Sequence, residues 1–392
     1  MITVDRKQFT RAVALASTVV ERRNTLPVLS GLKISANGSL ALHGSNLDEC
    51  TTAELPCQGD GFETCLLSPR EVAAALNAGG GGQVELTEPG DDNRLAVRGG
   101  QLHARVATLP ADDHPGAERI LSEDFACEIG AAELGAIARV VPAISTEETR
   151  YYLNGICVHK VGEWLWRFAA TDGHRLMMVD VPLPGATGAI PDGTIIPRRW
   201  IEKVLHHFRK AKQGARLTYG PTAIANRDDG ADLAPAKPGI PRISVAGMLV
   251  DDIRFTVTGK LIDGTYPDYT RVIPAAPGFV ARLKRADLVQ AINALTPLAT
   301  ERRRAVKLIF ETDSILCQLN SPDVGEGSFR IPAEHKAPAN FNVAFNAQYL
   351  LDICAVLLGD EVELGLTHAT YPTLVSDPAD TAFRAVLMPM RV

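Results

Sequence analysis

The chain has 392 residues, of which 46 % are hydrophobic and 22 % are charged, and its formal net charge is −6. This composition is typical of a soluble globular protein with two or three domains, and no apolar run approaches the ~18 residues that a membrane-spanning helix needs. Because the N-terminus lacks the basic, apolar and small-residue parts of a signal peptide, we expect a cytoplasmic protein with no membrane partner.

Two amphipathic helix patterns occur three times along the chain. In the first pattern, apolar residues recur at three- and four-residue spacing, and it begins near Phe9, Leu134 and Leu288. The second follows roughly 60 residues later, and a strand-like run follows each second helix. The second helices begin near Val72, Trp200 and Tyr349, and the strand-like runs cover 83–86, 215–218 and 361–364. The repetition predicts three copies of one domain.

Short strand-like segments with frequent turn residues separate the helices. Two helices beside many antiparallel strands predict α+β domains, with the helices on one face of the sheets. Proline-rich and acidic turns suggest the domain boundaries. We predict domains at 1–122, 123–276 and 277–392, with a Pro-, Gly- and Asp-rich mobile loop at 225–241.

The sequence shows none of the common motifs of metal or nucleotide sites. The seven cysteines are scattered without a CxxC pair, which disfavours a zinc ribbon or a thioredoxin-type site. The chain also has no P-loop, HExxH or GxSxG motif. We therefore expect reduced cysteines, no metal, no cofactor and no ATP hydrolysis.

Net negative charge argues against nucleic-acid binding, which requires neutralisation of phosphates. The distribution of charge points the other way, because the helix after Pro197 carries basic residues against one acid, Glu202. The basic residues are Arg198, Arg199, Lys203, Arg209, Lys210 and Lys212. Acidic residues gather in turns instead. Basic helices could face a polyanion while acids face outward; the alternative is ordinary solvated helix faces.

Five segments occur in an order that points to one family. They are 23–29 (RNTLPVL), 150–155 (RYYLNG), 170–176 (ATDGHRL), 263–269 (DGTYPDY) and 388–392 (MPMRV). Together with the threefold repeat, they resemble the bacterial sliding clamps, the beta subunits of DNA polymerase III, along the whole chain. The resemblance implies a head-to-tail homodimer in which six domains form a ring, with helices lining the hole and sheets forming the outer wall.

The resemblance implies a set of residues that face DNA. They are Arg23, Arg70, Arg150, Tyr151, Tyr152, Arg198, Arg199, Lys203 and Lys210. The alternative for the two tyrosines is packing under a loop. If they lie in a strand they point to opposite faces, so one of them is expected to be exposed. A plain solvated role is the alternative for each lysine.

The same resemblance implies a pocket for partner peptides. Its walls are Thr171, Gly173, His174, Arg175, Leu176, Pro267, Arg271, Val272, Arg303, Val386, Met388, Pro389, Met390 and Arg391. Flexible methionines suit such a surface, although core packing is the alternative for Met388 and Met390. Arg303 departs from the family, where many members have a bulky apolar residue, and it implies a more polar pocket on that side.

The dimer contact implied by the resemblance joins an edge strand of domain one to domain three. It involves Leu102, Ala104, Val106, Thr108, Pro297 and Leu298. The implied partners are duplex DNA, a second copy of the chain, the DNA polymerase III alpha subunit and the clamp loader delta subunit. Other polymerases and repair factors with a clamp-binding peptide complete the set.

Two rival functions remain open from the residues alone. Asp172, His174 and Arg175 could form the acid–base site of an enzyme, in which case His174→Ala would abolish turnover. A three-repeat scaffold that does not bind DNA would be a monomer without salt-sensitive retention on DNA. The resemblance favours a processivity factor without chemistry of its own.

Overall fold

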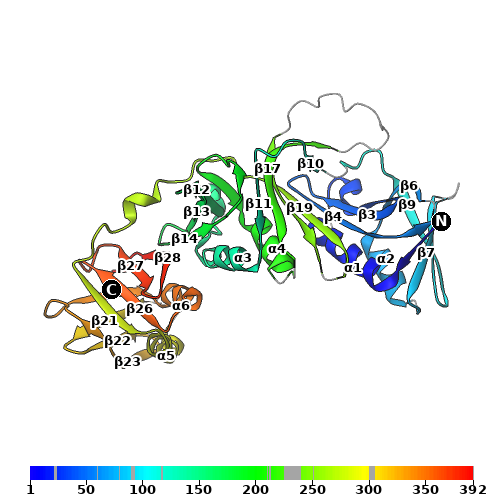
Figure 1. The fold of residues 1–392 in the computed structure, drawn as a ribbon. Coiled ribbons are helices and arrows are strands. Elements are labelled where there is room, and N and C mark those ends of the chain that lie inside the picture. The colour runs from blue at the N-terminus through cyan, green and yellow to red at the C-terminus, as the bar shows by residue number, and fades with distance from the viewer. Residues whose placement is uncertain are drawn as a thin grey trace. The chain divides into compact units, whose positions relative to one another are not determined.

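The computed structural model describes residues 1–21, 24–59, 61–78, 80–89, 93–115, 118–209, 211, 213–224, 240–249, 251–299 and 305–391 (Figure 1). These residues form two compact units. Unit 1 contains Met1–Gly135, Leu183–Pro191 and Arg199–Leu261, and unit 2 contains Ala136–Pro182, Asp192–Arg198 and Ile262–Val392. Within the described part of the chain, no helix has both the length and the apolar character needed to cross a bilayer.

All six predicted helices are present. They are α1 (Arg6–Ala16), α2 (Pro69–Ala78), α3 (Ala131–Ala138), α4 (Arg198–Phe208), α5 (Arg285–Leu295) and α6 (Ala347–Val356). Local sequence explains where they begin. Asp5 accepts a hydrogen bond from the Gln8 amide at 2.9 Å, and Asn346 caps α6 in the same way. In α1, Phe9 and Val13 lie four residues apart and are buried against the sheet.

The strands of unit 1 form one antiparallel sheet of 15 strands in the described residues. Its order is β15 (Thr187–Gly188), β11 (Phe125–Ile129), β17 (Ala215–Ile224), β18 (Pro241–Met248), β19 (Arg254–Lys260), β4 (Glu49–Pro56), β3 (Ser39–Ser45), β2 (Leu32–Asn37), β6 (Phe62–Leu67), β9 (Leu102–Pro110), β8 (Arg94–Gly99), β7 (Gln83–Thr87), β1 (Ile2–Asp5) and β5 (Gln58–Gly59), with β10 (Glu118–Ile120) beside β17. Alternate residues of β2 and β3 are buried, as expected for strands with one face on a core.

Unit 2 contains two antiparallel sheets. The larger follows the order β16 (Thr194–Pro197), β12 (Gly155–Lys160), β13 (Leu165–Thr171), β14 (Arg175–Pro182), β28 (Asp380–Leu387), β27 (Thr373–Asp377), β26 (Glu361–Leu366), β20 (Phe279–Lys284) and β24 (Glu334–His335). The smaller consists of β23 (Gly325–Pro332), β22 (Ser314–Ser321), β21 (Ala305–Glu311) and β25 (Asn342–Asn346). Helices beside antiparallel sheets confirm the predicted α+β class.

Two strand pairs join consecutive copies of the repeat. In unit 1, β4 pairs with β19, and its first residue, Glu49, lies opposite Gly259. In unit 2, β14 pairs with β28, and its first residue, Arg175, lies opposite Leu387. We call these two ladders the seams. They show that the three copies share continuous sheets.

The two tyrosines of the 150–155 segment correct a sequence prediction. They lie in a 3₁₀ turn, η4 (Glu148–Leu153), and the strand begins only at Gly155. The backbone of Arg150 departs from helical angles, and the Asn154 amide closes the turn on the Tyr151 carbonyl at 3.0 Å. Alternation across a sheet therefore does not decide which tyrosine is exposed.

The domain boundaries and the loop remain predictions. The division into two units cuts within the second predicted domain, so it does not locate the two boundaries between the three predicted domains. Most of the predicted loop, 225–239, lies outside the described residues, and its last residue, Pro241, begins β18.

Candidate functional site

A cavity of about 330 Å³ lies within unit 2. Residues from the predicted pocket line it, namely Thr171, Gly173, His174, Arg175, Leu176, Pro267, Val272, Val386 and Met388. They come from the β13–β14 turn, from the segment before and within η5 (Tyr269–Val272), and from the end of β28. Three stretches far apart in the sequence therefore meet at one cavity.

The β13–β14 turn is held by the side chain of Asp172. One carboxylate oxygen accepts the amides of His174 and Arg175 at 2.9 and 3.0 Å, the geometry of an Asx turn. Thr171 Oγ1 donates to the Arg175 carbonyl at 2.6 Å and accepts the Gly173 amide at 3.1 Å. The turn is thus rigid, and it presents the exposed imidazole of His174 at the cavity wall.

Arg175 is buried and fully engaged. Its Nε lies 3.1 Å from Asp172, its Nη1 lies 2.5 Å from Asp352, and its guanidinium stacks over the Tyr349 ring at 4.2 Å. Asp172 and Arg175 therefore hold the turn and the neighbouring helix α6. This arrangement favours the structural interpretation of the motif over the acid–base interpretation.

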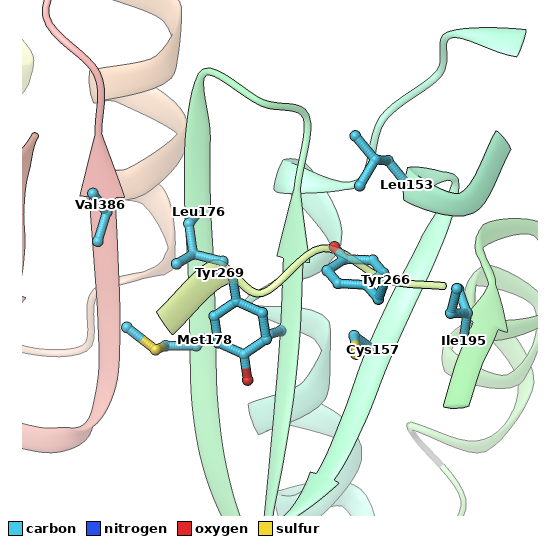
Figure 2. Packing of buried hydrophobic residues seen from close by; sticks show 9 residues of the cluster. Leu153, Cys157, Leu176, Met178, Ile195, Tyr266, Tyr269 and Val386 are labelled. Carbon is cyan, nitrogen blue, oxygen red and sulfur yellow. The ribbon is translucent and has the colours of Figure 1, made fainter. Parts of the chain in front are cut away.

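An apolar cluster forms the floor of the cavity (Figure 2). Leu176 and Val386 lie opposite each other on β14 and β28, and Leu153, Tyr266 and Tyr269 pack with them. Burial raises the pKa of Tyr269 to about 12 and raises that of Tyr266 still further. Both phenols are therefore neutral at physiological pH. The Tyr266 hydroxyl accepts the Thr171 amide at 2.9 Å and so ties the floor to the turn.

The C-terminal tail lies between two cavities. The Met388 amide donates to the His174 carbonyl at 2.9 Å, and the Met390 amide donates to the Ala344 carbonyl at 2.7 Å. The two methionine side chains are 37 % and 38 % exposed, which argues against the core-packing alternative. Met388 lines the first cavity. Pro389, Met390 and Arg391 instead line a second cavity of about 300 Å³.

Arg271 and Arg303 are the remaining residues of the predicted pocket. Arg271 is exposed, pairs with Asp268 at 3.0 Å and does not line the cavity. Arg303 lies outside the described residues, so its effect on the pocket stays a prediction.

The cavity wall also contains residues that sequence reasoning missed or assigned elsewhere. Leu153, Asp268 and Tyr269 were missed, and Arg150 and Tyr152 were expected to face DNA. Arg150 Nη2 lies 2.7 Å from Glu147. A Cβ on Gly173 would come within 2.6 Å of Arg150 Nη1. For Asp268 and Tyr269 the available signal was adjacency to Pro267, whereas Arg150, Tyr152 and Leu153 lie in the 150–155 segment, which the resemblance assigned to DNA.

The candidate DNA-facing residues are in different environments. Tyr151 is 54 % exposed, and Arg70 and Arg199 are also exposed. Arg198 donates to the Ile144 carbonyl at 3.2 Å. Lys203 forms an ion pair with Glu49 at 2.5 Å, with the two side chains only 13 % and 10 % exposed. Arg23 and Lys210 lie outside the described residues.

Lys203 therefore departs from the prediction of a DNA contact. One face of α4 is buried through Trp200, Ile201 and Val204. Lys203 projects beside that face and reaches Glu49, the first residue of β4. The helical pattern alone could not reveal a partner so distant in sequence.

The candidate dimer residues lie on β9 and on the 3₁₀ turn η6 (Thr296–Leu298). In the described part of the chain, β9 has only β8 beside residues 102–107. Thr108 corrects the prediction of an open edge there, because it pairs with Leu67 and is buried. The Val106 side chain is also buried, so the groups available for pairing at this position are those of the backbone. Leu298 packs against the β23 backbone at Gly327.

Comparisons with known proteins agree with this architecture. Caulobacter vibrioides has a relative described as "Beta sliding clamp", which is 31 % identical over 100 % of both chains. A crystal structure of the C. crescentus beta sliding clamp, with PEG bound to a putative beta-motif tethering region, aligns with a TM-score of 0.84 at 30 % identity, covering 100 % of this chain and 98 % of the other. A Bartonella birtlesii sliding clamp bound to griselimycin aligns with a TM-score of 0.83 at 30 % identity, covering 100 % and 99 %.

The domain models of one family match successive parts of the chain. The N-terminal, central and C-terminal domains of the DNA polymerase III beta subunit match residues 1–118, 132–268 and 270–391. The match covers nearly the whole chain in the expected order. The chain therefore belongs to the DNA polymerase III beta subunit family, the bacterial sliding clamps, and contains the three clamp domains of that family.

Proposed function

We propose that the chain is a DNA sliding clamp that encircles duplex DNA and tethers the replicative polymerase. The observation that carries the proposal is full-length family membership together with an intact apolar cavity at the expected motifs. The clamp performs no chemistry, and an ATP-driven loader opens it. It acts in the cytoplasm on nucleoid DNA.

The proposed hold on DNA is topological. A closed ring needs only weak, sequence-independent attraction to phosphates, because strong base contacts would stop sliding. Among the described candidates, Arg70, Arg199 and Tyr151 have the exposure for such contacts. An overall charge of −6 is compatible with this mode of binding, since affinity for DNA does not have to come from tight contacts.

The first cavity is the proposed binding site for partner peptides. Its apolar floor suits an aliphatic and aromatic pair at the end of a peptide, and the half-exposed Met388 can adapt to different side chains. The DNA polymerase III alpha subunit, the loader delta subunit and repair factors would compete for this site. Competition follows because all of them would insert the same kind of peptide.

The proposed assembly is a head-to-tail dimer, and the repeat supports it. The seams join β4 to β19 and β14 to β28. The corresponding strands of the remaining copies are β23 and β9. In the described residues, β23 pairs only with β22, and β9 has an open edge. Pairing of β9 with β23 of a second copy would repeat the same seam between chains.

The two seams also predict the register of this intermolecular ladder. Ile262, three residues after Gly259, forms a β-bridge with Ile195 in the strand before α4. Met390, three residues after Leu387, forms the corresponding bridge with Ala344 in the strand before α6. In the first copy, Leu109 pairs with Leu66 of β6, so the equivalent of Gly259 and Leu387 is Val106. Val106 then lies opposite Gly325, and Arg105 lies opposite Glu326. Both charged side chains are exposed and opposite in sign, which favours this register.

Two experiments test the function. Labelled Gln-Leu-Ser-Leu-Phe peptide should bind the intact protein at micromolar concentration, and deletion of residues 388–392 should abolish binding in an anisotropy titration. The loaded protein should remain on nicked circular DNA and be lost after linearisation. Equal retention on circular and linear DNA would exclude a topological clamp.

A further inference from the structure

Two buried arginines cross the seam of unit 2. Arg139 and Arg175 belong to the segment Ala136–Pro182, and they are 8 % and 9 % exposed. Both reach acids that belong to the C-terminal copy of the repeat, Asp380 and Asp352. Arg175 borders the cavity described above, whereas Arg139 is not among the residues that line it.

Arg139 follows α3 and contacts three parts of the facing repeat. Its Nε donates to the Val356 carbonyl at the end of α6 at 2.7 Å. Its Nη1 lies 2.6 Å from Asp380, the first residue of β28, and its guanidinium lies 4.3 Å from the centre of the Phe383 ring. A buried guanidinium with an acid, a carbonyl and an aromatic face as partners has one well-defined position.

The two arginines hold opposite ends of one ladder. Strand pairing between β14 and β28 runs from Arg175 opposite Leu387 to Val179 opposite Phe383. Arg175 anchors the first end through Asp352, and Arg139 anchors the second end through Phe383 and Asp380. The ladder is therefore fixed to both repeats at each end.

The cavity depends on this ladder because its walls lie on both sides of it. Leu176 belongs to β14, whereas Val386 and Met388 belong to β28 and the tail. A small shift between the strands would change the spacing of these side chains. Since packed interiors tolerate few voids, such a shift would lower the fraction of molecules with a binding-competent cavity.

We propose that Arg139 is a positioning residue for the peptide cavity: by fixing β28 against the preceding repeat, it keeps the cavity preformed without touching its ligand. The inference rests on the proposed binding of partner peptides at this site. It assigns a binding role to a side chain outside the cavity and distinguishes Arg139 from a residue that contributes to stability alone.

The test uses the full chain and a double variant, Arg139→Met with Asp380→Asn. Removing Arg139 alone would leave a buried acid without its partner and would strongly destabilise the fold, whereas the double variant removes both charges. Asparagine also keeps the Oδ1 acceptor that binds the Ala382 amide. Labelled Gln-Leu-Ser-Leu-Phe peptide is titrated at 25 °C, and urea unfolding and amide hydrogen exchange are measured on the same samples.

We expect the double variant to bind the peptide roughly tenfold more weakly, as when the competent fraction falls to about one tenth. The amides of Val386 and Met388 should exchange faster. Arg139→Lys, which keeps a charge for Asp380, should recover part of the affinity. Leu319→Ala serves as the control, because Leu319 is buried in β22 away from the seam; it should lower stability and leave peptide affinity unchanged.

The outcomes separate the inference from the function on which it rests. Wild-type affinity in a folded but less stable double variant would overturn the positioning role. The same conclusion follows if Leu319→Ala weakens peptide binding as much as the double variant does. Failure of the wild-type protein to bind the peptide would instead overturn the proposed function.

Discussion

Glycine at position 173 is required by two features of the β13–β14 turn. Its φ of +89° lies in the region that L-residues rarely adopt, and a Cβ would lie 2.6 Å from Arg150 Nη1. The first feature is a matter of backbone strain. The second places the Arg150 side chain against the turn that forms one cavity wall.

Gly173→Ala is therefore expected to lower both stability and peptide affinity. Strain accounts for about 1–2 kcal/mol of unfolding free energy, and displacement of Arg150 should weaken the peptide several-fold. Gly185→Ala is the matched control, because Gly185 has φ +77° but no atom within 4 Å of the added Cβ. Urea unfolding and peptide anisotropy of both variants provide the comparison. Equal peptide affinities would show that Arg150 does not shape the cavity.

Lys203 and Arg199 lie on the same helix but are expected to act differently. Lys203→Met leaves Glu49 buried without its cation, so unfolding free energy should fall by about 2–4 kcal/mol. Arg199→Ala removes an exposed cation, so stability should hold while retention on circular DNA becomes less salt-dependent. Urea unfolding and the retention half-life at several salt concentrations separate the two effects. Unchanged stability of Lys203→Met would contradict the ion pair.

At the scale of elements, the helices and most strands could be predicted because their signals are local. Apolar spacing indicates helices at Phe9 and Leu288, and the repeat reinforces each assignment. The η4 turn could not be predicted, since the sequence around Tyr151 also suits a strand. The Lys203–Glu49 pair was inaccessible because it depends on which strands become neighbours. The pocket residues came from motifs, whereas Arg150 entered the wall through tertiary packing.

Helix α4 also contains a titratable group that depends on packing. His207 lies against Phe255 with ring centres 5.0 Å apart. Burial, with smaller contributions from His206, Arg11 and Lys203, lowers the pKa of His207 from 6.5 to about 4. The unfolded chain therefore binds a proton at a higher pH than the folded chain does.

Stability should consequently fall as pH decreases through the window from 6.5 to about 4. Above that window the neutral imidazole imposes no penalty, and at its lower end the loss from this group is on the order of 1–3 kcal/mol. His207→Gln should flatten this part of the profile of unfolding free energy against pH. If the profile keeps its slope in the variant, another group titrates in this window. One such group is His114, because burial also lowers its pKa to about 4.

At the scale of the whole molecule, one type of seam joins consecutive repeats at both junctions within the chain. Each inner seam carries an ion pair between the buried first residue of its strand and a partly buried side chain on the second helix of the next repeat. These pairs are Glu49 with Lys203 and Arg175 with Asp352, with the signs reversed. In the proposed intermolecular seam the first strand residue is Gly325, at φ +144°, and the facing helix position is Ala74. That seam therefore lacks the buried pair and depends on backbone pairing and exposed charges.

The exposed pair Arg105 and Glu326 should then contribute measurably to ring closure. Arg105→Glu places like charges opposite each other at both interfaces of a dimer, and each reversal costs roughly 0.5–1 kcal/mol. We expect the dimer dissociation constant, measured by analytical ultracentrifugation, to rise roughly tenfold. Glu326→Arg should act similarly, and the double exchange should restore most of the affinity.

Arg98→Glu is the control for Arg105→Glu, because Arg98 is also exposed but lies on β8, one strand away from the open edge. Oxidative cross-linking then tests the register directly. His103 and Ser328 lie opposite each other in the predicted ladder. The pair His103→Cys and Ser328→Cys should therefore cross-link two chains more readily than His103→Cys and Phe329→Cys, since a one-residue slip directs the side chains to opposite faces. If the charge reversals leave the dimer dissociation constant unchanged and the two cysteine pairs cross-link equally, a different surface joins the two chains. The two seams within the chain would then not describe how two chains pair in the dimer.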